Sequence, residues 1–402
     1  MGVLPGASSS SGPSSEQVSS FLREAGLKYS ARRDAYAELG VLYERKHWHQ
    51  LTVLLLQLVS ASGGVSGAEA VELFSRFVRG FRSELNRLSL AKLALAAADG
   101  SDGPETAVEL IGDCIDFISE AQGGDPREPV TLLRIKEASI KLHRANDWLG
   151  CNKLLGECED VLKGMLDVDA SVHAAFHRTG SDVAKSKGDH NAFYRSALKY
   201  LAFVSLDDLL EEEREALALD LAVSALVGTE VYSLGELLGH PICGALEASE
   251  SHSWLLAVIR AFNAGDIPGY DKLCVQYATQ MGSNAILVRH AQELRQKATI
   301  LSLLNLIFSR PAGEREVTFS DISAHTGLAT PEVELLLMKA LSLGLIQGIV
   351  DQIDATVQIS WCQPQVLNRA QVGELRDRMV TWTGKVQKLA VLVEHETVEL
   401  SA

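Results

Sequence analysis

The 402-residue sequence is poor in aromatic residues and in positive charge. Aromatic residues make up 6% of the chain while Leu and Ala dominate, a balance that favours helices over strands. The 37 Lys and Arg residues face 52 Asp and Glu residues, so the formal net charge is −15. This charge disfavours a protein whose main role is to bind the phosphate backbone of nucleic acid or an anionic membrane surface.

Targeting segments and long apolar runs are also missing. Residues 1–14 are rich in Ser, Gly and Pro, lack the basic and apolar regions of a secretory signal, and are expected to be disordered. Gly6 stands where an N-myristoylation signal needs Ser or Thr, and no run of about 18 apolar residues predicts a membrane span. The six cysteines form no CxxC pair, which indicates reduced thiols in an intracellular protein and neither disulfides nor a zinc site.

Catalytic and cofactor-binding motifs are absent as well. The sequence has no GxxxxGKS/T loop, no GxGxxG after a strand, no HExxH and no GxSxG. His47 and His49 diverge on a helix, and Ser60 stands where a zinc-dependent deubiquitinase needs Asp. His173 and His177 share a helical face but lack a third metal ligand. We therefore predict no enzyme activity, no metal and no cofactor.

From residue 15 to residue 308 the sequence reads as one amphipathic helix after another. Predicted helices include 88–98, 107–118, 130–142 and 154–166. The breaks between helices are short and rich in Gly, Asp or Ser, as at 62–64, 99–104 and 123–126. Helices joined by short turns without intervening strands predict an α-hairpin array or a bundle.

A repeated turn favours the array. Asp147 and Asp189 are 42 residues apart, and Asp189 and Asp266 are 77 apart, close to twice that spacing. An Asp at this place can cap the second helix of a hairpin. A period of about 40 residues with two helices per unit predicts a tetratricopeptide-like or HEAT-like solenoid. The similar turns are Lys46-His47-Trp48, Asn146-Asp147-Trp148, Gly188-Asp189-His190 and Gly265-Asp266-Ile267.

The pattern changes after residue 308. A short strand is predicted at 317–319, followed by a helix at 321–325 that Ser320 caps. A second helix starts with Thr330 as N-cap and stops at Gly344. Apolar residues alternate with polar ones at 357–361, which predicts a half-buried strand paired with 345–350 across a turn at 351–354. Two short helices followed by a β-hairpin predict a winged helix.

The last predicted helix, about 366–399, carries a heptad seam. Seven large apolar residues are spaced alternately three and four apart, so they share one face of the helix. A terminal helix with such a seam needs other helices to cover it, either from its own domain or from another chain. The seam residues are Val372, Leu375, Met379, Trp382, Val386, Leu389 and Val393.

Charge weighs against a DNA-reading role for the winged helix. Its second helix carries Glu332, Glu334 and a single Lys339, whereas reading the major groove takes Arg, Lys, Asn or Gln. Residues 295–402 contain 10 basic and 12 acidic residues. The module is therefore better interpreted as a protein-pairing domain.

The acidic cluster at 207–213 lies at the start of a predicted helix, where its negative charges complement the helix dipole. The alternative interpretation of this cluster is a patch that binds a partner protein.

Several longer stretches, in matching order from about residue 43 to the C-terminus, carry a resemblance to a known family. A helical-repeat solenoid followed by a winged helix and a terminal helix resembles PCI-domain proteins, which are scaffolds in the proteasome lid, the signalosome and a translation initiation factor. The stretches are most similar to the 26S proteasome non-ATPase regulatory subunit 13 family. They are YERKHWHQLT (43–52), NRLSL (86–90), GELLGHP (235–241), WLL (254–256), AFNAG (261–265), FSRP (308–311), EVELLLMKALS (332–342) and WCQP (361–364).

The resemblance implies a non-catalytic subunit of the regulatory-particle lid, in cytoplasm and nucleus, that helps hold the deubiquitinating and ubiquitin-receptor subunits in place. Its partners would be other PCI-domain lid subunits and the lid deubiquitinase subunits, in a hetero-oligomer without nucleic acid or membrane. The alternatives are a scaffold of another PCI complex and a winged-helix regulator of nucleic acid. The expected domains are a tail at 1–14, a solenoid at 15–308, a winged helix at 309–365 and a bundle helix at 366–402.

We expect two docking surfaces. The terminal seam packs into a helical bundle, and the β-hairpin pairs edge-on with neighbouring winged helices by main-chain hydrogen bonds. The candidate contact residues on the hairpin are Ile349, Val357, Ile359 and Trp361.

Overall fold

The computed structural model describes residues 15–29, 32–60, 65, 67–101, 103–121, 125–249, 251–310, 315–367 and 369–400. The predicted tail at 1–14, the break at 62–64 and parts of the other two breaks lie outside these residues. The described chain is mainly helical with one small sheet near the C-terminus, which confirms the predicted fold class. It divides into two compact units, Met1–Val204 and Ser205–Ala402.

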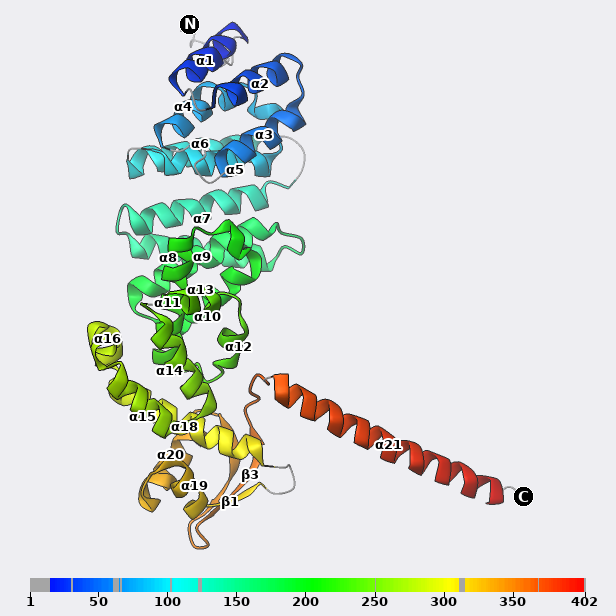
Figure 1. Cartoon of the computed structure of the whole chain (residues 1–402). Coiled ribbons are helices and arrows are strands. Elements are labelled where there is room, and N and C mark those ends of the chain that lie inside the picture. Colours follow the sequence, from blue (N-terminus) through cyan, green and yellow to red (C-terminus); the bar gives the residue numbers. More distant parts are fainter. Residues whose placement is uncertain are drawn as a thin grey trace, which may run out of the picture. The chain divides into compact units, whose positions relative to one another are not determined.

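In the first unit, most helices that are neighbours in the sequence also lie next to each other in space (Figure 1). The four predicted helices named above are present as α5 to α8, although α8 starts six residues and ends three residues before the predicted bounds. Two 3-10 turns, η2 (Val78–Gly80) and η3 (Arg82–Glu84), join α4 to α5. The helices are α1 (Ser15–Lys28), α2 (Arg33–Glu44), α3 (Trp48–Ser60), α4 (Ala68–Arg76), α5 (Arg87–Asp99), α6 (Pro104–Glu120), α7 (Arg127–His143), α8 (Trp148–Lys163), α9 (Ala170–Lys187) and α10 (His190–Phe203).

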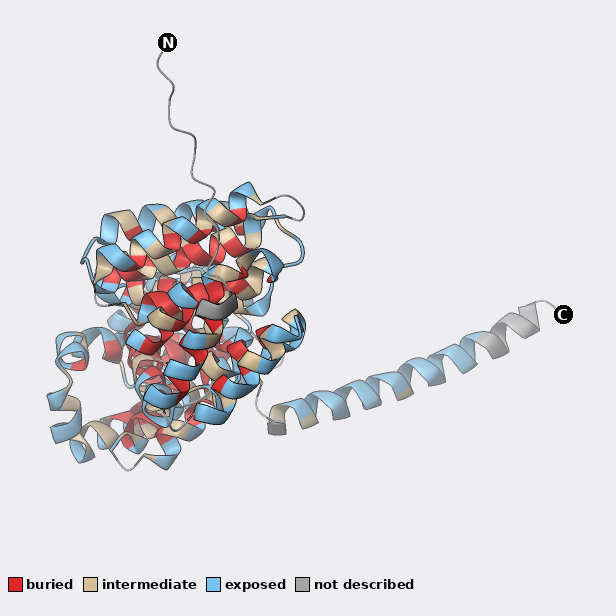
Figure 2. Ribbon diagram, turned by 90° about the horizontal axis from the view of Figure 1, so that it is seen from above, coloured by how far each residue is buried: buried red, intermediate tan, exposed pale blue. Residues whose placement is uncertain are grey.

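Leu and Ala fill the core of this unit. Leu90, Ala94 and Ala97 of α5, Ile111 of α6 and Leu133 of α7 are each at most 2% exposed. The buried residues lie on the helix faces that meet neighbouring helices (Figure 2). Because alanine side chains are small, the helix backbones can approach closely, which explains how a chain so poor in aromatic residues builds a dense core.

Four turns share one backbone conformation, as the repeated triplets predict. The first residue of each triplet has a positive φ: 56° at Lys46, 52° at Asn146, 72° at Gly188 and 66° at Gly265. In three of these turns the following Asp caps the second helix by accepting hydrogen bonds from backbone N–H groups two or three residues later, which confirms the predicted capping. These residues are Asp147, Asp189 and Asp266.

The doubled spacing between Asp189 and Asp266 does not reflect two regular repeats. No residue with positive φ lies between Gly188 and Gly265 in the part of the chain that the structure describes. The connection after α10 instead runs through extended backbone at Val204 and a 3-10 turn, η4 (Leu206–Asp208). A different connection therefore joins these helices, and the conformation of the repeated turn does not recur between them in the described residues.

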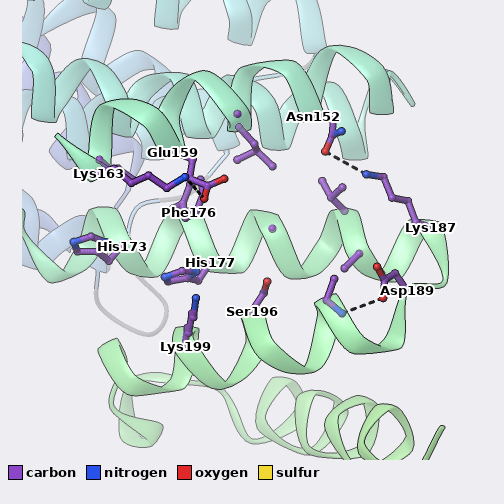
Figure 3. A pocket seen from close by; sticks show the side chains of 17 residues that line it. Asn152, Glu159, Lys163, His173, Phe176, His177, Lys187, Asp189, Ser196 and Lys199 are labelled. Carbon is purple, nitrogen blue, oxygen red and sulfur yellow. Dashed lines mark hydrogen bonds and ion pairs between the residues drawn. The ribbon is translucent and has the colours of Figure 1, made fainter. Parts of the chain in front are cut away.

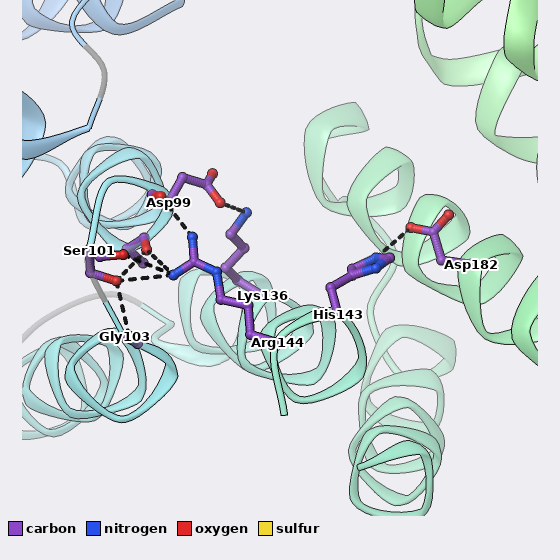
Figure 4. A network of polar contacts seen from close by, with 8 residues as sticks. Asp99, Ser101, Gly103, Lys136, His143, Arg144 and Asp182 are labelled. Carbon is purple, nitrogen blue, oxygen red and sulfur yellow. Dashed lines mark hydrogen bonds and ion pairs between the residues drawn. The ribbon is translucent and has the colours of Figure 1, made fainter. Parts of the chain in front are cut away.

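Cationic side chains link helices that are distant in sequence (Figure 4). The Arg144 guanidinium, just after α7, donates hydrogen bonds to the carbonyl oxygens of Asp99 (2.7 Å) and Ser101 (3.2 Å) at the end of α5. Lys136 of α7 forms an ion pair with the Asp99 carboxylate. These contacts satisfy carbonyl groups that a helix C-terminus leaves without partners, and they hold α5 against α7.

The second unit begins with helices of varied length and ends in the sheet and a long helix. The breaks between its helices are short, as in the first unit. The elements are α11 (Glu211–Val227), α12 (Gly235–Gly239), α13 (Cys243–Ala248), α14 (Ser253–Ala264), α15 (Ile267–Gln276), α16 (Ala278–Ser283), α17 (Ala285–Arg289), α18 (Ala291–Ser309), β1 (Glu316–Thr318), α19 (Phe319–Thr326), α20 (Thr330–Ser342), β2 (Ile346–Asp351), β3 (Thr356–Cys362) and α21 (Arg369–Leu400).

The predicted winged helix is present, with small differences at its helix starts. The sheet has the order β1-β3-β2, with both pairs antiparallel, and α19 and α20 precede its hairpin. Thr318, not Ser320, caps α19, because its hydroxyl accepts the backbone N–H of Asp321 (3.2 Å). The helix α20 starts one residue earlier than predicted, since Ala329 is its N-cap and donates its backbone N–H to the Glu332 carboxylate.

Candidate assembly interface

The heptad seam of α21 is exposed along its whole described length. The seven seam residues have exposed fractions between 44% and 68%, and Trp382, the largest, is the most exposed. Figure 2 shows the long C-terminal helix mostly in the colour of exposed residues. A large apolar surface of this kind on a folded protein marks a site of interaction with another chain. The side chains of the predicted seam are therefore exposed on the surface of this chain.

Val380 and Val391 lie on the side of α21 that is nearly opposite the seam, and they are 66% and 64% exposed. At 100° per residue these two positions lie about 80–100° round the helix from Val372, whereas the middle of the seam lies about 50° from Val372 in the other direction. Asp377 lies about 40–60° from the two valines on their own side of the helix. The seam is therefore the continuous apolar stripe of the described part of α21.

The β-hairpin offers one open edge. β3 is the central strand, paired with β1 on one side and β2 on the other, so its backbone is already hydrogen-bonded. β2 is an edge strand of this sheet, and an edge strand can pair with a strand from another chain. The edge of the predicted hairpin that could extend a shared sheet is therefore β2, not β3.

The structure separates the four predicted hairpin contacts into two pairs. Ile349 and Trp361 are 73% and 40% exposed. Val357 and Ile359, in contrast, are 0% and 3% exposed, because their side chains belong to the core of the winged helix. The two buried side chains cannot contact a partner, which corrects that part of the prediction.

A β-bulge explains why Trp361 points outward. In the register, Gln347 pairs with Trp361 but Gly348 pairs with Ile359, so Ser360 is the extra residue on β3. An extra residue reverses the alternation of sides beyond it. The simple alternation expected for 357–361 therefore fails at its last residue.

Apolar residues on α20 and at the hairpin tip extend this surface, and the sequence reasoning missed them. Leu335 and Met338 are 67% and 57% exposed, and Ile353 in the turn is 96% exposed. The available signal was that Leu335 and Met338, three residues apart, both lie off the buried stripe of the helix. The basic residue of this helix, Lys339, donates a hydrogen bond to the side chain of Gln296 (2.7 Å).

The side-chain clusters in the described residues carry no arrangement typical of an active site. Ser249, His252 and Glu215 lie together, but the Ser249 hydroxyl and the His252 ring both bond to the same carboxylate oxygen. These bonds lower the pKa of Glu215. The same ring nitrogen of His252, Nδ1, lies 3.3 Å from the Ser249 hydroxyl and 2.9 Å from the Glu215 carboxylate, whereas the histidine of a catalytic triad uses its two ring nitrogens for these two partners. No group of three His, Cys, Asp or Glu that could hold a metal occurs in that part of the chain.

The four histidines that the sequence analysis considered as metal ligands lie in two separate places. His47 and His49 are exposed around the start of α3. His173 and His177 stack on the ring of Phe203, with ring centroids 5.1 and 6.0 Å away, and burial lowers the pKa of His177 to about 4. None of the helices in the described ranges is long and apolar enough to span a membrane.

Comparisons with known proteins agree with this architecture. Residues 35–259 match the family of PSD13 N-terminal repeats, and residues 275–361 match the PCI domain. The chain is 36% identical to the 26S proteasome non-ATPase regulatory subunit 13 homolog B of Arabidopsis thaliana over 94% of this chain and 100% of that protein.

Two further relatives come from distant organisms. The chain is 35% identical to the 26S proteasome non-ATPase regulatory subunit 13 of Dictyostelium discoideum, over 90% of this chain and 92% of that protein. It is 31% identical to the 26S proteasome regulatory subunit RPN9 of Saccharomyces cerevisiae, over 89% and 92%. These matches cover both units and confirm the resemblance found in the sequence. The chain belongs to the 26S proteasome non-ATPase regulatory subunit 13 family.

Proposed function

We propose that this chain is a non-catalytic structural subunit of the 26S proteasome regulatory-particle lid, present in cytoplasm and nucleus. It scaffolds lid assembly and helps position the ubiquitin-processing subunits for ubiquitin-dependent degradation. The observation that carries the proposal is the exposed apolar seam of α21 in a chain whose relatives are named as proteasome regulatory subunits.

The seam is large enough to make assembly depend on it. Burying seven large apolar side chains at about 1.5–3 kcal/mol each gives an upper value of roughly 10–20 kcal/mol, before the cost of ordering the helices. The helices of other PCI-domain subunits and of the lid deubiquitinase subunits are the partners that we propose for the seam.

The winged helix supplies a second contact in this proposal. The edge of β2 extends a shared sheet with a neighbouring winged helix, and Ile349 and Trp361 pack beside it. The apolar side chains of Leu335 and Met338 favour a protein over DNA as the partner of α20. The alternatives of another PCI complex and of a nucleic-acid regulator differ from this proposal in their partners.

A pair of substitutions on α21 tests the proposal. Met379→Glu places a charge in the seam, whereas Thr381→Glu places the same charge on the polar side of the same helix turn. We expect Met379→Glu to reduce incorporation into lid reconstituted from its purified subunits at least tenfold, because the charge would be buried without a partner. Thr381→Glu should assemble normally. The readout is the fraction of each variant that co-elutes with intact lid.

Assembly of Met379→Glu at wild-type stoichiometry would overturn the bundle proposal. Since Met379 is 61% exposed, both variants should match the wild-type chain in helix content, so a folding defect is separable from an assembly defect. Mass spectrometry of the proteins bound to the tagged chain separates lid from another PCI complex. A salt-dependent affinity for duplex DNA that Lys339→Glu abolishes would favour the nucleic-acid alternative.

A further inference from the structure

A groove runs along the outer face of α9, between α8 and α10, within the first unit. It has a volume of about 750 Å³ and is lined by residues of all three helices. Its floor extends from His173 to Lys187 of α9, which corresponds to roughly 20 Å of helix. The groove is thus long enough for several residues of another chain to lie along it.

Positive charge is concentrated on the walls of the groove. Figure 3 shows Lys163 of α8 and Lys199 of α10 on opposite walls, with His173 and His177 of α9 between them. Lys199 is exposed, and no ion pair joins it to another residue within the ranges that the structure describes. Lys187 lies towards the other end of the groove, where it donates a hydrogen bond to the side chain of Asn152 (3.2 Å).

The negative groups of the groove are already engaged. Glu159 forms an ion pair with Lys163 at 2.8 Å. Asp189 accepts backbone N–H bonds as the N-cap of α10. The three lysines and two carboxylates that line the groove sum to a net charge of 3 − 2 = +1 in a chain of net charge −15. Because Lys163 is paired with Glu159, Lys187 and Lys199 are the lysines of the groove that remain for a ligand. A ligand with free carboxylates complements the groove.

Two glycines inside the helices line the groove at positions where a larger side chain would have room. Gly156, in the middle of α8, is exposed, and a Cβ atom added there would meet nothing within 4 Å. A Cβ at Gly180 of α9 would come no closer than 3.7 Å to the Ser196 hydroxyl, an ordinary contact. Glycine is the weakest helix former apart from proline. Its presence on the floor and on a wall permits the backbone of another chain to approach closely.

We propose that this groove binds an acidic peptide segment of a partner protein, laid along α9 between α8 and α10. Lys187 and Lys199 pair with carboxylates of the segment, and the glycines admit its backbone. Nucleic acid fits less well, because the parts of a long polyanion that extend beyond the groove meet the negative charge of the rest of the chain. The site lies in the first unit and does not depend on the seam or the winged helix.

Binding of a defined peptide tests the groove. The probe is a fluorescein-labelled 15-residue peptide, Glu-Ala-Ala-Ala-Glu repeated three times, titrated with the full chain at low salt and followed by anisotropy. We expect saturable binding that weakens with salt. Lys199→Glu should weaken it at least tenfold through charge, and Gly156→Leu should do so by filling the groove. The peptide with Lys in place of Glu should not bind.

Matched substitutions outside the groove are the controls. Lys153→Glu reverses an exposed charge on α8, and Gly112→Leu fills an equally open position inside α6. Both should bind within twofold of the wild-type chain. Because no atom lies close to Gly156, its Leu variant should keep the wild-type helix content by circular dichroism.

Three results would overturn the proposal. The first is a folded Gly156→Leu chain that binds the acidic peptide as tightly as the wild type. The second is equal weakening by Lys153→Glu, which would indicate unspecific charge attraction. The third is tighter binding of a single-stranded oligonucleotide of the same charge, which would identify the groove as a nucleic-acid site. A chain that binds the peptide as expected but fails to enter the lid would refute only the proposed function.

Discussion

Single side chains from distant helices close the ends of helices in both units. Arg144 does so for α5, and Lys297 of α18 does so for α11. Lys297 is 5% exposed, and its Nζ donates hydrogen bonds to the carbonyl oxygens of Ala225 (2.7 Å), Leu226 (3.0 Å) and Gly228 (2.7 Å). These contacts satisfy carbonyl groups that would otherwise be buried without donors.

The sequence predicts local caps and misses these distant ones. The Asp side chains of the repeated turn accept bonds from residues at most three positions away, so the triplets alone reveal them. Lys297 is about 70 residues from its acceptors, and Arg144 about 45 from Asp99. Nothing in their local sequence distinguishes these two cations from the many exposed ones, because only the packing of the helices brings them to their partners.

Lys297 predicts a pH dependence of stability. Burial lowers the pKa of Lys297 to about 7, from an ordinary value of 10.5. In the unfolded chain Lys297 keeps its proton up to about pH 10.5, so unfolding takes up a proton between these two values. The contribution of this group to the free energy of unfolding therefore increases as the pH rises from 7 towards 10.5, and is lost as the pH falls through 7.

The comparison with Lys297→Met measures this contribution. The difference in free energy of unfolding between the wild type and Lys297→Met, from urea titrations at pH 7, 8 and 9, should grow with pH in favour of the wild type. Lys272→Met, at an exposed position on α15, should show no such trend. A difference that stays constant from pH 7 to 9 would contradict the assigned titration.

At the scale of the element, the spacing of apolar residues predicted the helices correctly, but the alternation expected for the strand at 357–361 did not hold at its bulge. The helices of the solenoid and α21 follow from apolar residues three and four apart, a pattern that holds over many residues. The strand at 357–361 is short, so one extra residue was enough to misplace Trp361. Gly348, inside β2 opposite the bulge, was the available signal, because glycine within a strand often marks a bulge or a close approach.

Gly348 is required by the hairpin, which gives a test of the bulge. A Cβ atom at this position would come within 2.3 Å of the Gln358 carbonyl oxygen, a backbone atom that cannot move aside freely. We expect Gly348→Ala to destabilise the winged helix by about 1–3 kcal/mol through overpacking. Hydrogen exchange followed by mass spectrometry should show faster exchange in β2 and β3.

Gly373→Ala is the matched control. Gly373 lies in α21, and a Cβ atom there would meet nothing within 4 Å. Alanine is the better helix former, so this substitution should leave the exchange of the strands unchanged and slow that of α21 slightly. Unchanged exchange in the hairpin of Gly348→Ala would show that the strands can shift to accept a side chain.

At the scale of the whole molecule, charge and apolar surface are distributed unevenly along the chain. Residues 295–402 carry a net charge of only −2, and this stretch contains the seam, the open edge of β2 and the exposed apolar residues of α20. The division into units after Val204 was not predicted, since the helical pattern continues across it. Which surface remains exposed depends on long-range packing that a linear pattern does not contain.

The exposed seam predicts association of the chain when its partners are absent. Because the seam residues are at least 44% exposed, removal of residues 368–402 deletes little of the packed core, and the melting temperature should change by no more than about 1 °C. The full chain, in contrast, should self-associate as its concentration rises, since seams of two molecules can cover each other. Sedimentation velocity on both chains measures this difference.

Added salt should not disperse the full-chain assemblies, because apolar contacts are not screened. A full chain that remains monomeric at high concentration would mean that the seam packs on its own molecule in solution, and the proposed bundle would then need a prior release step.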